Sequence, residues 1–172
     1  MRVRAKKAVA GVLGAVVLGV GGAAAYVAVA VPQIDCLWAD GELWAISYPS
    51  SPQAPPGDTV LAYVQAVVLR DRDGAAELTI PAFLEDQLGL GFDGPFCNWV
   101  DVSDPRMDEP LAERPESVPR DSGFTETAVV RARFLLRQHE EGRMRNGDTT
   151  LLYSLGRRSP NDHWIIYDVT DR

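Results

Sequence analysis

The N-terminal part of the chain contains one long stretch without a charged residue. Residues 8–31 are all uncharged and mostly apolar, and a helix of 24 residues is about 36 Å long at about 1.5 Å per residue. That length exceeds the roughly 30 Å of a bilayer hydrocarbon core. The stretch therefore predicts a transmembrane helix, and the rest of the chain must fold as a separate domain.

The charges on either side of this stretch predict its orientation. Residues 1–7 contain four basic side chains, whereas the next basic residue after the stretch is Arg70. Short basic flanking segments stay on the cytoplasmic side of a membrane. We expect a single-pass cell-membrane protein with a cytoplasmic N-terminus and an extracytoplasmic C-terminal domain.

A cleaved secretory signal is the alternative to an anchor. Cleavage after Ala30 fits the small-x-small pattern, but the apolar stretch is longer than the roughly 7–15 residues of an ordinary signal. Lipidation at Cys36 is disfavoured because Asp35, and not a small residue, precedes it. The anchor and the cleaved signal both place the domain outside the cytoplasm.

The part after residue 31 is acidic. It contains all 24 acidic residues of the chain and 13 of the 17 basic ones, which gives a net charge of −11. Nucleic acid and anionic lipid surfaces are therefore poor partners for it. Its length of about 140 residues is typical of one domain.

Both cysteines, Cys36 and Cys97, lie in the exported part. In an oxidising compartment we expect one disulfide bond between them, which would tie the segment beside the membrane to the body of the domain. Two buried free thiols are the alternative.

The sequence after the apolar stretch predicts helices before strands. We expect a juxtamembrane hairpin and a Pro-rich linker over 32–57, and the domain itself over 58–172. A helix is predicted from Asp58, as its N-cap, to the polar stretch 71–74. A second helix is predicted to begin at Pro81.

The C-terminal third alternates apolar and polar residues with a period of two. This pattern predicts three antiparallel strands, over 127–139, 149–157 and 163–169, with the turn at Asn146-Gly147 between the first two. A short strand is predicted at 96–102. The acidic, Pro-rich segment 103–123 is predicted to be a disordered loop. The fold class is α+β, with the helices packed on one face of the sheet.

This order of elements, ending in the strand "WIIYDV", resembles the nuclear transport factor 2-like (cystatin-like) superfamily, in particular small membrane-anchored or secreted members of actinobacterial envelopes. The resemblance covers about residues 58–169. It implies a sheet curled around a helix into a cone with a pocket, used by isomerases, cyclases and dehydratases and by many binding domains. It supplies no catalytic residue, because no position matches a motif.

Three short motifs give little support to cofactor or metal chemistry. Residues 89–94, "GLGFDG", follow a predicted helix, whereas a dinucleotide-binding loop follows a strand. "DRDG" at 71–74 lacks the spacing of a calcium loop, and His139 lacks further ligands nearby. We therefore expect no cofactor and no metal.

Two groups of residues remain as site candidates. His163 and Asp168 on the last strand are the candidates for proton transfer if a pocket exists. The side chains of Arg131, Arg133 and Arg137 share one strand face, where they either bind an acidic partner or form cross-strand ion pairs. We expect a non-enzymatic binding or scaffolding protein of the bacterial envelope. A small-ligand-binding protein or pocket enzyme is the alternative, and an apolar cavity would distinguish the two.

Overall fold

The structure is a computed structural model that describes residues 49, 51–111 and 118–171. The predicted basic segment 1–7, the transmembrane stretch 8–31, the hairpin within 32–48 and Cys36 lie outside the described residues. Within the described residues, no helix has the length and apolar character needed to span a membrane.

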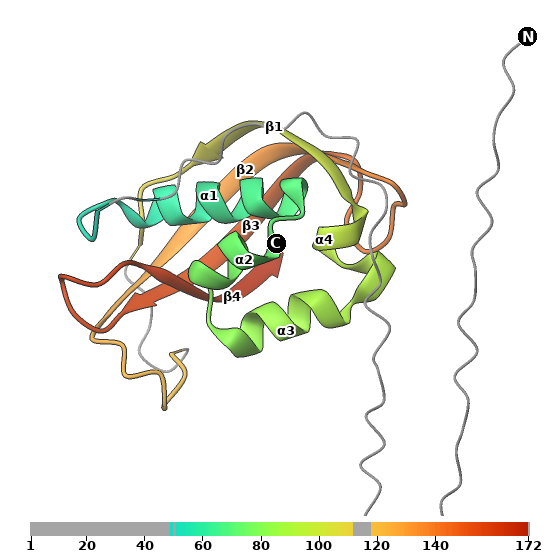
Figure 1. The fold of residues 1–172 in the computed structure, drawn as a ribbon. Coiled ribbons are helices and arrows are strands. Elements are labelled where there is room, and N and C mark those ends of the chain that lie inside the picture. Colours follow the sequence, from blue (N-terminus) through green and yellow to red (C-terminus); the bar gives the residue numbers. More distant parts are fainter. Residues whose placement is uncertain (1–48, 50, 112–117, 172) are drawn as a thin grey trace, which may run out of the picture. The chain divides into compact units, whose positions relative to one another are not determined.

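The described part places all its helices before its strands. The elements in chain order are α1 (Pro56–Leu69), α2 (Arg72–Glu77), α3 (Pro81–Gly89), the 3₁₀ turn η1 (Gly91–Asp93), α4 (Pro95–Asn98), β1 (Trp99–Met107), β2 (Glu126–Gln138), β3 (Gly147–Arg157) and β4 (Ile165–Asp171). The strands form one open antiparallel sheet in the order β1-β2-β3-β4. The helices pack on one face of it (Figure 1). This confirms the predicted α+β class and the meander of the last three strands.

The first helix begins three residues earlier than predicted. Pro55 is its N-cap and Pro56 its first residue, whereas Asp58 lies in the first turn. The prediction of Asp58 as N-cap was wrong because proline at the first helical position has the required φ angle and lacks only an N–H that would have no partner there. The buried face of α1 includes Tyr63 together with Val60, Val64 and Val67.

The polar stretch 71–74 begins a helix instead of ending one. Arg70, at the end of α1, has a φ of 63°, which turns the chain. The Asp71 carboxylate then accepts a hydrogen bond from the Gly74 N–H at 2.9 Å and caps α2. Asp71 could be recognised from the sequence as a capping residue. The left-handed conformation of Arg70 before it depends on contacts with distant parts of the chain, such as the Trp99 carbonyl.

The predictions for 96–102 and 103–123 were partly wrong. Residues 96–98 belong to the one-turn helix α4, and β1 then extends to Met107 through the Pro-rich segment. The register shifts between Ser103 and Arg106, and Asp104 has a φ of 52°. A bulge on an edge strand accommodates Pro105, since proline at that place removes no ladder hydrogen bond. Residues 112–117 lie outside the described residues.

The largest buried side chains meet at the centre of the domain. Tyr63 of α1 lies 5.8 Å from Phe83 of α3, 6.4 Å from Phe96 of α4 and 6.0 Å from Tyr153 of β3, measured between ring centroids. The helices α1, α3 and α4 thus contribute aromatic rings to one cluster, at separations typical of attractive aromatic pairs. Two members of this cluster, Tyr63 and Tyr153, line the cavity described next.

Candidate functional site

A cavity of about 460 Å³ lies at one end of the sheet, beside the loop that joins β2 to β3. This volume is in the range of small-molecule sites. Its walls come from α1, α3, α4, the four strands and the β2–β3 loop. The lining residues are Tyr63, Gln87, Leu90, Asp93, Pro95, Asn98, Trp99, Gln138, Gly142, Arg143, Met144, Leu151, Tyr153, Val169 and Asp171.

Two buried tyrosines contribute to the inner wall. Tyr63 and Tyr153 are each at most 2% exposed, and their rings meet edge to face. Burial raises the pKa of the Tyr63 phenol. Burial, and secondarily the neighbouring Tyr63, raises the pKa of Tyr153 well above its ordinary value. Both phenols therefore stay protonated at neutral pH and can donate hydrogen bonds.

Two polar atoms of the lining side chains have no hydrogen-bond partner among the described residues. They are the Tyr63 hydroxyl and the indole Nε1 of Trp99, and both are buried. Buried polar groups in folded proteins are nearly always hydrogen-bonded, because an unsatisfied one costs free energy.

Asn98 fixes the loop that closes one side of the cavity. Its amide nitrogen donates to the Glu140 carbonyl at 2.8 Å and to Gln138 Oε1 at 3.3 Å, and its Oδ1 accepts from the Glu140 N–H at 2.9 Å. Gln138 also donates to the Met144 carbonyl at 3.2 Å. These bonds hold the loop that carries Gly142 against α4.

The turn at the other end of this loop was predicted from the sequence. Asn146 Oδ1 accepts a hydrogen bond from the Gln138 N–H at 2.6 Å, and Gly147 follows with a φ of 111°. Only glycine adopts that angle readily. The predicted turn at Asn146-Gly147 is confirmed, and it also positions the cavity loop.

An ion pair stands at the rim of the cavity. The Arg143 guanidinium binds both carboxylate oxygens of Asp171, with Nε to Oδ2 at 2.9 Å. The hydrogen bond from Arg143 lowers the pKa of Asp171, and the same bond raises the pKa of Arg143. The pair links the β2–β3 loop to the end of β4. The pair is exposed and contributes little to the free energy of unfolding, so its main effect is to hold the loop beside the end of β4.

The predicted proton-transfer residues do not line this cavity. His163 is exposed and lies in the turn before β4, which begins only at Ile165. It lines a different hollow of about 610 Å³. Tyr153 pairs with Val169 of β4, whereas residue 163 lies before Ile165, the first paired residue of that strand. Asp168 is exposed, and its carboxylate accepts from the Val169 N–H at 2.9 Å. His163 and Asp168 therefore lie outside the cavity that Tyr153 lines, and a role of either in proton transfer stays a prediction.

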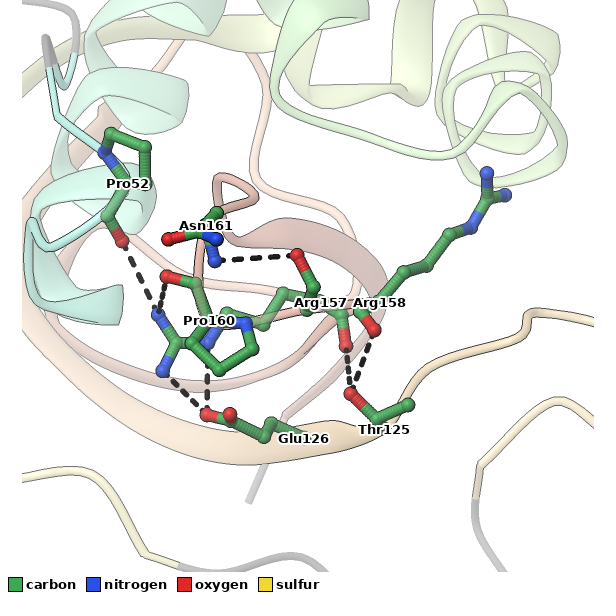
Figure 2. A network of polar contacts seen from close by, with 8 residues as sticks. Pro52, Thr125, Glu126, Arg157, Arg158, Pro160 and Asn161 are labelled. Carbon is green, nitrogen blue, oxygen red and sulfur yellow. Dashed lines mark hydrogen bonds and ion pairs between the residues drawn. The ribbon is translucent and has the colours of Figure 1, made fainter.

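Arg157 lines the hollow beside His163 and stands at the centre of a network of polar contacts (Figure 2). Its guanidinium binds Glu126 Oε2 at 2.9 and 2.5 Å, and donates to the carbonyls of Pro52 at 3.2 Å and Pro160 at 3.4 Å. It also lies 4.6 Å from the ring centroid of Trp164. These contacts tie residue 52 to the end of the sheet, so Arg157 has a structural function here.

Two of the three arginines on the outer strand face form ion pairs within the domain. Asp108 binds Arg131 at 3.5 Å and also binds Arg133, and Arg137 is exposed. A role of the three arginines in binding an acidic partner stays a prediction.

The remaining candidates concern cysteine and metal chemistry. Cys97 is buried in α4, and the described residues contain no free cysteine. Because Cys36 lies outside the described residues, the bridge between the two stays a prediction. In the same part of the chain, no group of three or more His, Cys, Asp or Glu side chains is placed to hold a metal ion. Residues 89–94 follow helix α3 and not a strand, as predicted.

Comparisons of this chain with known protein families, with curated proteins and with solved structures found no match.

Proposed function

We propose that this domain binds a small molecule in the cavity bounded by Tyr63, Trp99 and Tyr153. The observation that carries the proposal is the cavity itself, whose walls are mostly apolar. A solid interior would have favoured the scaffolding role. The cavity favours the alternative, ligand binding.

The proposal extends to location and family. The apolar stretch 8–31 and its basic flank support an anchored domain outside the cytoplasm, which would present the cavity to molecules of the cell envelope. The order of elements also supports membership of the nuclear transport factor 2-like superfamily. We favour binding without catalysis, because the groups that line the cavity supply hydrogen bonds and apolar surface, and the rim carboxylate of Asp171 is held by Arg143.

Blocking the entrance should abolish binding without harming the fold. A Cβ atom at Gly142 meets nothing within 4 Å, so Gly142→Trp adds a bulky ring at the cavity rim without a backbone clash. We expect the fluorescent, neutral dye N-phenyl-1-naphthylamine to bind the full chain, and Gly142→Trp to weaken this binding about tenfold or more, or about 1.4 kcal/mol.

Gly89→Trp is the matched control. Gly89 is also exposed and also has nothing within 4 Å of its Cβ, but it does not line the cavity. Dye that partitions into the apolar stretch 8–31 would bind both variants equally. Equal dye affinity of the wild type and both variants would reject the cavity as the binding site.

A further inference from the structure

The loop between β2 and β3 supplies three consecutive residues to the lining of the cavity, Gly142, Arg143 and Met144. Of the other lining residues, all except Leu90 belong to a helix, to the turn η1 or to a strand. Moving those residues would disturb the core or the sheet, whereas a loop can move with little loss of regular structure. The loop is therefore the wall of the cavity that opens most easily.

The middle of this loop lacks the hydrogen bonds that stabilise regular structure. In the described part of the chain, no backbone–backbone hydrogen bond joins residues 140–145 to any other residue. The loop is held by side chains instead, such as that of Gln138, whose amide donates to the Met144 carbonyl at 3.2 Å. Segments with few backbone hydrogen bonds open at a low cost in free energy.

The two ends of the loop are fixed more firmly than its middle. Asn98 makes two hydrogen bonds, at 2.8 and 2.9 Å, to the backbone of Glu140. At the other end, Asn146 Oδ1 accepts a hydrogen bond from the Gln138 N–H at 2.6 Å. Residues 141–145 lie between these two fixed points.

Two side chains in the middle of the loop hold it against the domain. Met144 is partly buried and packs against the hydrophobic core. Arg143 binds the Asp171 carboxylate at the end of β4, with Nε to Oδ2 at 2.9 Å, and both partners are exposed to solvent. An exposed ion pair changes an equilibrium by only about fivefold or less. This pair can therefore break while the domain stays folded.

The side chains of the inner wall are nearly inaccessible to solvent. Tyr63, Trp99, Leu151 and Tyr153 all line the cavity, and none of them is more than 5% exposed. A ligand that contacts these side chains over a large area needs the wall in front of them to move aside. Loops that open and close over bound molecules provide such access in many proteins.

We propose that residues 141–145 form a strap that opens to admit a ligand to the cavity, and that the ion pair between Arg143 and Asp171 is its latch. This proposal rests on the proposed function and adds how access to the same site is controlled. The latch is formed in the closed strap, whether the cavity is empty or filled, and is broken in the open strap. Its loss should therefore speed the entry and the release of a ligand to the same extent.

Stopped-flow fluorescence of N-phenyl-1-naphthylamine with the full chain measures both rates. Arg143→Gln and Asp171→Asn should each raise the association and dissociation rate constants about twofold to fivefold, and the Kd should change by less than about twofold. An ion pair that only shaped the wall would behave differently, because its loss would change the dissociation rate constant and the Kd together.

Reversing the charges tests the ion pair as a unit. Arg143→Glu places two carboxylates side by side and should accelerate both rates more than Arg143→Gln does. Adding Asp171→Arg to Arg143→Glu restores an ion pair with its charges exchanged. Both rate constants should then return to within about twofold of the wild-type values.

Arg145→Gln and Arg145→Glu are the matched controls. Arg145 belongs to the same strap and is exposed, but it does not line the cavity, so both variants should leave the two rate constants unchanged. If Arg143→Gln changes the rates no more than Arg145→Gln, or the reversed pair is as fast as Arg143→Glu alone, the latch is wrong although the cavity still binds the dye. If the wild type, Gly142→Trp and Gly89→Trp bind the dye with the same affinity, the proposed function itself fails.

Discussion

Asn98→Ala should lower the free energy of unfolding by about 3 kcal/mol. The buried Asn98 amide makes three hydrogen bonds, two of them to the backbone of Glu140. Its loss leaves the partly buried hydrogen-bonding groups of Glu140 and the buried Gln138 amide without these partners, and an unsatisfied buried group costs about 1–3 kcal/mol. Urea unfolding of the full chain, followed by near-ultraviolet circular dichroism, measures the change.

The same substitution should also weaken dye binding, because Asn98 holds the loop that carries Gly142 and Arg143 at the cavity. Asn161→Ala is the control, since Asn161 is exposed on the turn before β4 (Figure 2) and should change stability by less than about 0.5 kcal/mol. An Asn98→Ala variant as stable as Asn161→Ala would contradict the described loop network.

Gly156→Val should destabilise the domain by about 2–3 kcal/mol. A Cβ at this buried position of β3 would lie 2.8 Å from Cε2 of Phe124, and closer still to its Cγ and Cδ2. Phe124 cannot simply swing aside, because its ring stacks on Tyr167 with centroids 5.5 Å apart. Overpacking of this kind typically costs about 1–3 kcal/mol, and urea unfolding of the variant measures it.

A double-mutant cycle separates this clash from other effects. In a Phe124→Ala background the Cβ introduced at position 156 no longer meets the ring, so Gly156→Val should cost much less there. Gly142→Val, at a position with free space around the Cβ, should be close to neutral. An equal cost of Gly156→Val with and without Phe124 would show that the close approach does not limit the residue at this position.

The strands of the meander were predictable because their signal is local. In β2, apolar residues at every second position from Ala128 to Leu136 are the ones that the structure buries, and the turn needs only Asn146-Gly147. The path of β1 was not predictable in the same way. Pro105 predicts a break in the strand when the segment is considered alone. Pairing with β2 lets β1 continue past Pro105 through a bulge at the edge of the sheet.

The resemblance implied a pocket, but the position and the lining of the cavity could not be predicted from the sequence, because the signal for a hollow is the absence of a side chain where several elements meet. Tyr63 and Trp99 belong to apolar patterns that equally describe a filled core. Asn98 and Gln138 are 40 residues apart and meet only through the pairing of β1 with β2. His163 was assigned to a strand that in fact begins two residues later, at Ile165, and it lies outside this cavity.

The most direct test of the account is the nuclear magnetic resonance signal of the Trp99 indole N–H during titration with N-phenyl-1-naphthylamine. The Trp99→Phe variant assigns the signal, and Trp164, which lines the separate hollow near His163, serves as the internal reference. We expect the Trp99 signal to move and saturate while the Trp164 signal stays in place. A stationary Trp99 signal at saturating dye, or a shift confined to Trp164, would contradict the assignment of the cavity as a ligand site.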